Sequence, residues 1–318
     1  MNWGFIGFGR IARKFLTSLE SVQGETPYAF ASRSNAVELE KEFSDVKVYD
    51  NYESLFADPD IDIVYISTTH NFHCQNVIDA LSAGKHVLCE KPMGVSSDEI
   101  RKMMEVTKGT GKFLMEAMWM RFLPAYREAI RRAKSGEIGE IQYITASFGF
   151  NSPNLKPEGR LLNPDLAGGA LYDVGVYPLT IVSDIFGWQP DSFQAQAVLS
   201  ETGIDQSIQV QLSYKGGEMA QVFGSIAMNT NKEACIYGSE GFIKLPLFWK
   251  AQEFEIHKGD NIEKVELPFK STGYAHEIEE VVKCIKEGKT ESPLFTLNDS
   301  LMSANLVESI LSSIFNQS

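Results

Sequence analysis

"FIGFGRIA" (residues 5–12) decides the fold of the first part of this chain. An apolar run leads into Gly7 and Gly9, and small Ala12 follows, which matches the pattern G-x-G-x-x-[GA]. In this pattern the first glycine permits a tight turn, the second lets a pyrophosphate approach the backbone, and the third small residue lets a helix pack on the strand. The stretch therefore predicts a dinucleotide phosphate site at a helix N-terminus.

The first 118 residues alternate short apolar runs with amphipathic, helix-like segments. Gly84 marks the end of one such segment, and Ser96 marks the start of the next. The runs expected as strands are "WGFIGF" (3–8), "YAFAS" (28–32), "VKVY" (46–49), "IDIVYIST" (61–68), "HVLCE" (86–90) and "KFLMEAM" (112–118). This alternation predicts an α/β Rossmann domain, a doubly wound parallel sheet with crossover helices.

Beyond residue 118 the pattern changes. "IQYITASFGF" (141–150) and the runs between Ser192 and Pro268 alternate polar and apolar residues, which predicts neighbouring antiparallel strands. Helical segments begin near Tyr274 and Leu297. We therefore expect a Rossmann domain at residues 1–118 and an α+β domain at 119–318 with a large open, mostly antiparallel sheet. The C-terminal helix is a candidate to pack back on the first domain.

The charge of the chain limits its partners. With 29 basic and 42 acidic residues the formal net charge is −13, which argues against a surface for nucleic acid or anionic lipid. The N-terminus lacks a basic segment with a cleavage site, and no apolar run approaches the ~20 residues of a membrane helix. We expect a cytoplasmic protein without a membrane segment. The four cysteines lack C-x-x-C spacing, so neither a zinc site nor a redox pair is expected.

The second predicted strand ends in "ASRSN" (31–35), at the position where such folds recognise the ribose of the dinucleotide. An NAD site places an acidic residue there, whereas this chain has Ser32 and Arg33. Arginine can pair with the 2′-phosphate of NADP, and the alternative is an ordinary surface arginine. The sequence therefore favours NADP(H), with NAD(H) as the second choice.

Polar residues follow the fourth and fifth predicted strands, in "STTHNFH" (67–73) and "CEKPM" (89–93). Ligands of a doubly wound sheet bind beyond these carboxyl ends. His70, His73 and Cys74 suggest a metal site, but no further cluster of ligands completes one, so no metal is expected. The residues expected to bind the cofactor are Gly7, Phe8, Gly9, Arg10, Ile11, Ser32, Arg33, Thr68, Thr69, His70, Asn71, His73, Glu90 and Lys91.

Three motifs in order carry a resemblance to a known family. The N-terminal G-x-G-x-x-A, the Glu90-Lys91-Pro92 motif and "GGALYDVGVYPL" (168–179) together resemble the Gfo/Idh/MocA oxidoreductases over essentially the whole chain. "EAMWMRFLP" (116–124), "GEIGEI" (136–141) and "DVGVYPL" (173–179) are most similar to the branch that contains dimeric dihydrodiol dehydrogenases and related sugar dehydrogenases. The resemblance implies a Rossmann domain followed by an open, mostly antiparallel sheet.

The resemblance also implies catalytic roles for Lys91, Asp173 and Tyr177. Many relatives have histidine at the last position, and the tyrosine form is that of the dihydrodiol dehydrogenase-like branch. A phenol with a pKa of about 10 is a poor base near neutrality, but it can donate a proton, and the Lys91 ammonium would stabilise its phenolate. Asp173 can orient Lys91 or a substrate hydroxyl, while Pro178 implies an irregular helix. Taken singly, the three residues also fit a helix-start aspartate, a core aromatic and a solvated lysine.

Aromatic residues are candidates for the substrate pocket. Trp119 and Arg160 are expected to contact substrate with Tyr177, and the further candidates for the pocket wall are Phe148, Phe150 and Trp249. Aromatic walls suit a sugar ring and a cyclic diol equally well. We expect hydride transfer between a nicotinamide and a secondary alcohol or carbonyl of a sugar, polyol or cyclic diol.

Two other functions stay open from the sequence. One is a redox-neutral, NAD-dependent glycoside hydrolase of the same superfamily, and the other is a nucleotide-sensing regulator without catalysis. The retention of Lys91, Asp173 and Tyr177 argues against the regulator. An open sheet with a broad exposed face predicts a homodimer or higher homo-oligomer formed through that face.

Overall fold

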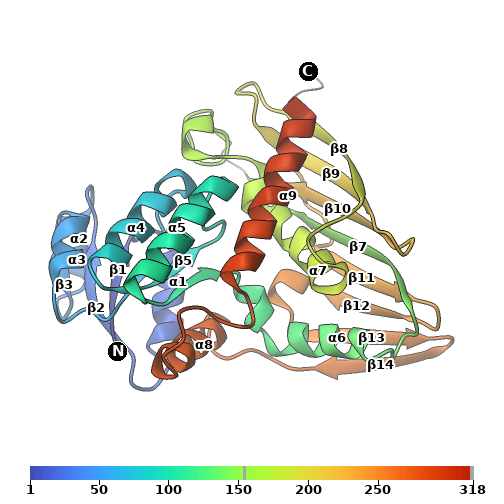
Figure 1. Cartoon of the computed structure of the whole chain (residues 1–318), viewed down its shortest axis with the longest axis horizontal. Coiled ribbons are helices and arrows are strands. Elements are labelled where there is room, and N and C mark those ends of the chain that lie inside the picture. Colours follow the sequence, from blue (N-terminus) through green and yellow to red (C-terminus); the bar gives the residue numbers. More distant parts are fainter. Residues whose placement is uncertain (153–154, 316–318) are drawn as a thin grey trace. The chain divides into compact units, whose positions relative to one another are not determined.

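The computed structural model describes residues 1–152 and 155–315 and is drawn in Figure 1. Contacts between Cα atoms divide the chain into two compact units. The first comprises Met1–Trp119 and Lys270–Leu301, and the second comprises Met120–Phe269 and Met302–Ser318. The predicted second domain, residues 119–318, differs from the second unit by Trp119 and by the segment Lys270–Leu301. Hydrophobic periodicity shows that a helix in this segment is amphipathic without showing what it packs against.

The first unit contains a six-stranded parallel sheet in the order β3-β2-β1-β4-β5-β6. Its strands are β1 (Asn2–Ile6), β2 (Thr26–Ala31), β3 (Lys47–Tyr49), β4 (Ile63–Ile66), β5 (His86–Glu90) and β6 (Leu114–Ala117). Its helices are α1 (Arg10–Leu19), α2 (Ala36–Glu42), α3 (Tyr52–Ala57), α4 (His73–Ser82), α5 (Ser97–Thr110) and α8 (Ala275–Lys286). The strand order reverses between β1 and β4, so the topological switch point, where such sheets bind ligands, lies at the carboxyl ends of these two strands.

The sequence explains the helix boundaries in this unit. The Ser96 hydroxyl accepts a hydrogen bond from Glu99 N at 3.2 Å, and the Glu99 carboxylate accepts one from Val95 N at 2.8 Å, so α5 begins with a reciprocal cap. Gly84, with φ at +80°, follows the end of α4 in the left-handed region that glycine adopts without strain. Every residue of β4 is buried, as expected for a parallel strand covered on both faces.

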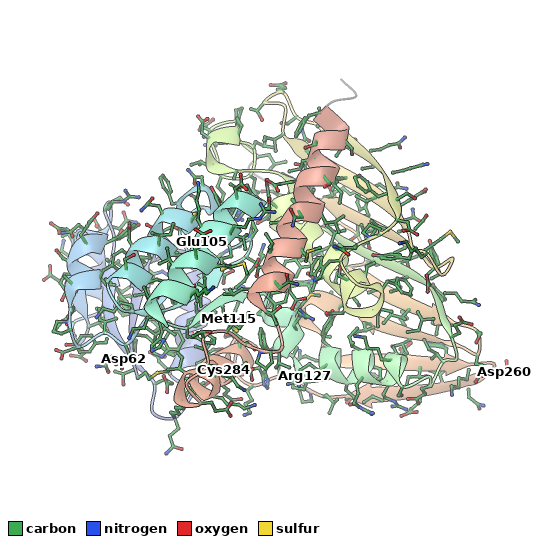
Figure 2. All side chains as sticks on the ribbon, viewed as in Figure 1. Asp62, Glu105, Met115, Arg127, Asp260 and Cys284 are labelled. Carbon is green, nitrogen blue, oxygen red and sulfur yellow. The ribbon has the colours of Figure 1, made fainter. Side chains whose placement is uncertain are left out.

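Helix α8 belongs to the first unit although it lies near the end of the chain. It packs on α1, and the Ser18 and Thr272 hydroxyls lie 2.7 Å apart. Met115 on β6 and Cys284 on α8, both labelled in Figure 2, are fully buried. The core of this unit is therefore completed by residues from the C-terminal part of the chain.

The second unit contains an eight-stranded sheet in the order β14-β13-β12-β11-β7-β10-β9-β8. Its strands are β7 (Ile141–Gly149), β8 (Ser192–Leu199), β9 (Asp205–Ser213), β10 (Met219–Ser225), β11 (Glu233–Gly238), β12 (Phe242–Pro246), β13 (Glu253–Lys258) and β14 (Asn261–Glu266). Its helices include α6 (Pro124–Lys134), the π-helix η4 (Leu171–Gly175) and α7 (Val176–Phe186), and α9 (Leu297–Phe315) runs from residues of the first unit into the second. The expected mostly antiparallel sheet is confirmed.

One part of the predicted strand order is wrong. The runs from Ser192 to Pro268 were expected to be neighbours, but β7 lies between β10 and β11. Strand β7 pairs with β10 in parallel and with β11 antiparallel. Because the segment 226–232, and not a two-residue turn, connects β10 to β11, the chain can pass over the intervening strand.

The two faces of this sheet differ in their covering. Helices α6 and α7 pack on one face, with α7 against β7 and β10 and α6 against β12 and β13 (Figure 1). The side chains that alternate to the other face include Val198, Met219 and Ile262, which are 63%, 54% and 63% exposed. The second face therefore presents apolar side chains to solvent.

The segment Pro164–Phe186, which contains η4 and α7, is long and apolar enough to cross a membrane by length and composition. Within it, 78% of the apolar window is buried inside the structure. The hydropathy of this segment is explained by its position on the sheet, as in the core helix of a globular protein. The expected cytoplasmic location stays a prediction.

Candidate active site

The turn between β1 and α1 requires glycine at Gly7. Its φ is +76°, and a Cβ atom there would lie 2.5 Å from the Thr68 nitrogen and 2.7 Å from the Ser67 oxygen. At Gly9 the atom nearest to a Cβ would be the Gly7 oxygen at 3.9 Å, so the space is open. Gly9 is the N-cap of α1 and has no side chain, which leaves the N–H groups of the first helical turn open to an anion. This cradle fits the pyrophosphate of a dinucleotide.

The other residues predicted around this turn have different surroundings. The Phe8 ring is 9% exposed and packs on Phe30 with ring centroids 4.2 Å apart, so this side chain belongs to the core. Arg10 is exposed and Ile11 is half-buried in the first turn of α1. Only the backbone of Phe8 is therefore available to a ligand at the turn.

Arg33 follows β2 and lies between two aromatic rings. Its guanidinium carbon is 4.8 Å from the centroid of Tyr52 and 5.4 Å from that of Phe72. Stacking on aromatic faces restrains a guanidinium while its N–H groups stay at the ring edges. Arg33 is exposed, and the neighbouring Ser32 hydroxyl accepts a hydrogen bond from Asn35 N at 3.1 Å. The group is held as a planar donor that can receive a phosphate.

His73 joins the loop after β4 to the loop after β5. The ring is fully buried, with Nδ1 2.8 Å from the Pro92 oxygen and Nε2 3.0 Å from the Thr68 oxygen. Burial is the main cause that lowers the pKa of His73. Since both ring nitrogens contact main-chain oxygens, the side chain fixes the segment that carries Lys91. Among residues 1–152 and 155–315, no group of three or more His, Cys, Asp or Glu side chains is placed to hold a metal ion.

The rest of the loop after β4 is half-buried, comprising Thr68, Thr69, His70 and Asn71. Asn76 Nδ2 donates to the Thr68 hydroxyl at 3.1 Å, and the Thr69 hydroxyl donates to Asn71 Oδ1 at 2.8 Å. The loop is thus ordered by its own hydrogen bonds next to the switch point of the sheet.

Two acidic residues, half-buried Glu90 and buried Glu116, lie close to the segment of Lys91. Glu90 accepts a hydrogen bond from the Tyr65 hydroxyl at 2.6 Å, and Glu116 accepts one from Met93 N at 3.2 Å. Burial raises the pKa of Glu116, and the positive charge of Lys91 opposes this rise. The segment of Lys91 therefore lies beside two carboxylates, Glu90 and Glu116.

Trp119, the last residue of the first segment of this unit, has a mostly buried ring. It is 6% exposed and stacks on Tyr274, with centroids 4.7 Å apart and planes at 18°. Tyr274 precedes α8, so the C-terminal segment of the unit supports the predicted substrate residue.

Asp173 and Tyr177 lie on consecutive helical elements of the second unit. Asp173, on η4, forms an ion pair with Arg160 at 3.0 Å between Oδ1 and Nη1. Tyr177, on α7, is 7% exposed and lies in an aromatic cluster, 5.5 Å from the Phe148 centroid and 6.3 Å from that of Trp249. The second unit therefore brings five of the residues predicted for catalysis and the pocket wall into two groups: Asp173 with Arg160, and Tyr177 with Phe148 and Trp249.

The irregular helix predicted from Pro178 is present as the π-helix η4, which precedes α7. π-Helical turns are rare and occur frequently at functional sites. A close glycine contact seats this segment on the sheet, because a Cβ at Gly224 of β10 would lie only 3.2 Å from Gly175 Cα. Lys91 belongs to the first unit and Tyr177 to the second. Their joint action stays a prediction.

Two family models match the chain. Residues 1–118 match the oxidoreductase family with an NAD-binding Rossmann fold, Gfo/Idh/MocA, and residues 126–244 match the C-terminal domain of that family. The chain belongs to the Gfo/Idh/MocA family. The predicted family and fold are confirmed. This protein is an oxidoreductase that acts on CH–OH groups with a nicotinamide cofactor.

Relatives of this Gfo/Idh/MocA chain match it from end to end. The trans-1,2-dihydrobenzene-1,2-diol dehydrogenase of Mus musculus is 35% identical over 324 residues, covering 97% of this chain and 95% of that protein. The enzyme of the same name from Xenopus laevis is 33% identical and covers 98% and 97%. A solved 3-ketoreductase from Actinomadura kijaniata, in complex with NADP and TDP-benzene, has 26% identity and a TM-score of 0.89, covering 99% and 98%.

Sequence reasoning missed several residues of the candidate site. Tyr52 and Phe72, which hold Arg33, are ordinary aromatic residues at distant positions, and no local pattern relates them to it. Tyr65 contacts Glu90 from the neighbouring strand β4. The sequence predicted a parallel sheet without the pairing of its strands, and the register of β4 with β5, in which Tyr65 pairs with Leu88, places Tyr65 and Glu90 close together. Only this register could have pointed to the contact.

Proposed function

We propose that this protein transfers hydride between NADP(H) and a secondary alcohol or carbonyl of a cyclic diol or sugar. The observation that carries the proposal is the aromatic cluster around Tyr177, in a chain whose relatives are named for oxidation of a cyclic trans-diol. Half-buried Trp249 stacks one face on Phe148 with centroids 4.7 Å apart, and its other face would suit the apolar face of a six-membered ring. Arg160 and Trp119 are proposed as further substrate contacts.

The cofactor is proposed to bind along the carboxyl ends of β1, β2 and β4. Gly7, Gly9 and the N-terminus of α1 would hold the pyrophosphate, and the half-buried loop from Thr68 to Asn71 would line the adjoining part of the site. Arg33 would bind the 2′-phosphate, which favours NADP(H) over NAD(H). When bound, the nicotinamide supplies or accepts the hydride.

The chain's own residues would move the proton. Tyr177 would donate its phenolic proton to the oxygen of a carbonyl during reduction and accept one from the alcohol during oxidation. The Lys91 ammonium would stabilise the phenolate and lower the pKa of Tyr177 toward neutrality. Asp173, paired with Arg160 at 3.0 Å, would keep that guanidinium directed at a substrate hydroxyl.

A substrate and cofactor screen tests this proposal. Purified protein is incubated with trans-diols, aldoses, inositols and dicarbonyls, each with NADP(H) and NAD(H), and absorbance at the nicotinamide band is followed. We expect turnover with a cyclic diol or sugar and a higher kcat/KM with NADP(H). Release of the alcohol from aryl glycosides without net change of NADPH would instead identify a redox-neutral hydrolase, and binding of NADPH without turnover would identify a regulator.

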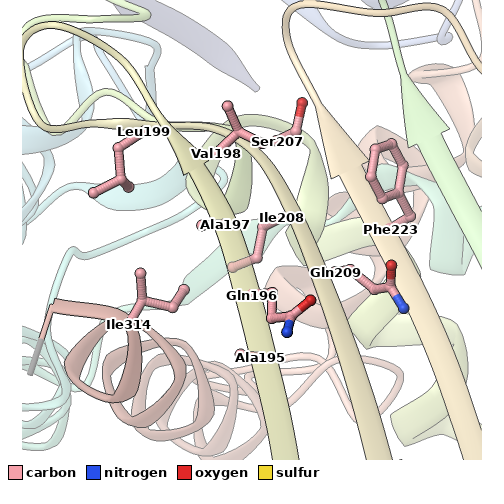
Figure 3. A pocket seen from close by; sticks show the side chains of 10 residues that line it. All are labelled: Ala195, Gln196, Ala197, Val198, Leu199, Ser207, Ile208, Gln209, Phe223 and Ile314. Carbon is pink, nitrogen blue, oxygen red and sulfur yellow. The ribbon is translucent and has the colours of Figure 1, made fainter. Parts of the chain in front are cut away.

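The exposed face of the eight-stranded sheet is proposed to pair with a second copy of this chain. A cavity of about 490 Å³ at the β8 end of the sheet, shown in Figure 3, is lined by Val198 and Phe223 of this face and also by buried Ile208 and by Ile314 of α9. Exposed apolar side chains on strands are otherwise a liability. Light scattering should give the mass of a homodimer or higher oligomer, and Met219→Glu should lower it; a monomer at micromolar concentration would contradict the pairing.

A further inference from the structure

A buried carboxylate lies at the N-terminal end of the segment that carries Asp173 and Tyr177. Asp205 begins β9 and is 2% exposed. Its Oδ2 accepts a hydrogen bond from Leu171 N at 2.7 Å, and the backbone N–H of Ala170 donates to the same carboxylate. The first N–H groups of a helix have no partner within the helix, so an anion here satisfies them and opposes the positive end of the helix dipole.

The preceding loop is shaped to receive this carboxylate. At Gly169, where φ is +126°, a Cβ atom would lie 2.2 Å from Asp205 Oδ1. Any side chain at that position would displace the carboxylate or the loop. The second glycine of the G-G-A-L-Y-D motif is therefore explained by Asp205, whose partner Leu171 lies 34 positions earlier in the chain.

The other end of α7 is anchored separately. Asp184 accepts a hydrogen bond from the Tyr126 hydroxyl at 2.5 Å and forms an ion pair with Arg121. These contacts hold α7 two turns beyond Tyr177, whereas the end nearer to Asp173 is the π-helix η4. A π-turn is less regular than an α-turn, so the orientation of η4 depends on its contacts with the sheet. The hydrogen bonds from η4 to the Asp205 carboxylate are charge-assisted contacts of this kind.

We propose that ionised Asp205 is a positioning residue, which holds η4 and the start of α7 so that Tyr177 has the orientation needed for proton transfer. This inference rests on the function proposed above for Tyr177. Asp205 itself is buried beneath the helix terminus and is not assigned contact with substrate or cofactor.

The ionisation of Asp205 would set the pH at which the segment is held. Burial raises the pKa of Asp205 to about 7, and the backbone N–H donors oppose this rise. The charged residues on the adjoining elements include Asp173, Arg160, which pairs with it, Asp165 in the loop before Gly169, and Glu201 in the turn before β9. When η4 loosens, Asp205 stays buried but loses the N–H donors that lower its pKa, so its pKa is higher in the loosened state and protonation favours that state; global unfolding, which exposes the carboxylate to water, has the opposite dependence. The fraction of correctly held enzyme should therefore rise with pH through about 7.

Kinetics of Asp205→Asn test the inference. The amide presents an NH₂ group to the helix N–H donors and resembles the protonated acid. Because a misplacement of about 1 Å can cost about 100-fold in rate, we expect kcat at pH 8 to fall by at least about tenfold. The KM for NADPH should stay unchanged, and the rise of kcat/KM near pH 7 should be absent. Asp191→Asn, which alters a carboxylate with 41% side-chain exposure in the same unit, should match the wild type.

Hydrogen exchange separates this inference from the proposed role of Tyr177. The amides of residues 170–175 should lose protection in Asp205→Asn, and in the wild type they should lose protection between pH 8 and pH 6 after correction for intrinsic rates. The wild-type measurement needs no variant, so it decides the matter even if Asp205→Asn does not fold. Wild-type kinetics in Asp205→Asn, or unchanged protection of these amides in either comparison, would overturn the inference. If Tyr177→Phe retains activity, the proposed function fails while the exchange result still judges Asp205.

Discussion

Gly224→Ala is predicted to disturb the segment of Tyr177 through a single methyl group. The new Cβ would lie 3.2 Å from Gly175 Cα, 3.4 Å from Gly175 N and 3.5 Å from Ile208 Cγ2. Carbon atoms in contact prefer about 3.5–4.0 Å, so Gly175 must move away from β10 by about 0.3–0.8 Å. Gly175 is backbone at the junction of η4 and α7, so no side-chain rotation can absorb the contact.

The expected cost of this overpacking is about 1–3 kcal/mol in the free energy of unfolding. For a unit of this size each kcal/mol shifts Tm by about 2–4 °C, so Tm should fall by about 2–12 °C. Because Gly175 lies two residues from Asp173 and from Tyr177, kcat should fall by about tenfold, within the range known for sub-ångström to 1 Å misplacement. Differential scanning calorimetry and steady-state kinetics on the same preparation measure both effects.

Gly109→Ala is the matched control for this substitution. Gly109 lies in α5 without positive φ, and a Cβ added there would have no atom within 4 Å, so alanine should stabilise the helix by about 0.5–1 kcal/mol and leave kcat unchanged. Gly224→Ala with the Tm and kcat of the wild type would refute the close seating of η4 on β10.

Three further perturbations have defined outcomes. Arg33→Ala should raise the KM for NADPH by about tenfold to 150-fold, which corresponds to the loss of one charged hydrogen bond. The KM for NADH should change little, and an equal increase in both KM values would contradict binding of the 2′-phosphate by Arg33. Tyr126→Phe should lower the free energy of unfolding by about 1–3 kcal/mol in urea titrations, since it removes the donor to buried Asp184, and an unchanged midpoint would contradict that. Native Asp205, with its pKa raised to about 7, holds a proton that the unfolded chain releases near pH 4, so its contribution to stability should be present below pH 4 and be lost as pH rises toward 7. The unfolding midpoint of the wild type should therefore fall relative to that of Asp205→Asn between pH 4 and pH 7, and parallel curves would contradict this.

Much of the fold could be predicted because it depends on local pattern. The strand-helix alternation before residue 118 and the cap at Ser96 are set by residues close in sequence, and the six-stranded parallel sheet follows from them. The position of β7 between β10 and β11 could not be predicted, because alternation marks a strand without naming its neighbours. The same reason explains why the segment Lys270–Leu301 was not assigned to the first unit.

The candidate site was predictable to different degrees. Gly7 was recognisable because it stands in a known sequence pattern. The structure explains the pattern, since both the positive φ of Gly7 and its close contact with Ser67 require glycine. Lys91, Asp173 and Tyr177 were identified by family resemblance, and their roles stay proposals. The aromatic pair around Arg33 had no local signal, since Tyr52 and Phe72 reach it only after folding.

Asp205 shows the same limit for a buried polar group. Its partners are backbone N–H groups, one of them 34 positions away. Since every residue except proline has a backbone N–H group, the residue types do not show which of these groups the carboxylate binds. In the sequence, the contact is reflected in Gly169, which belongs to a motif that carries the family resemblance. The physical reason for this glycine is visible in the structure, where a Cβ atom at Gly169 would lie 2.2 Å from Asp205 Oδ1.

The central claim is that Tyr177 transfers the proton with help from Lys91, and single-turnover oxidation of NADPH with the best substrate of the screen tests it most directly. Tyr177→Phe removes one hydroxyl and keeps the aromatic cluster, and Lys91→Met removes the charge at similar length. We predict that each lowers the single-turnover rate by about 10²–10⁴-fold, while NADPH affinity, measured by fluorescence titration, stays within about threefold for Tyr177→Phe. Single-turnover rates equal to that of the wild type in both variants would contradict the claim.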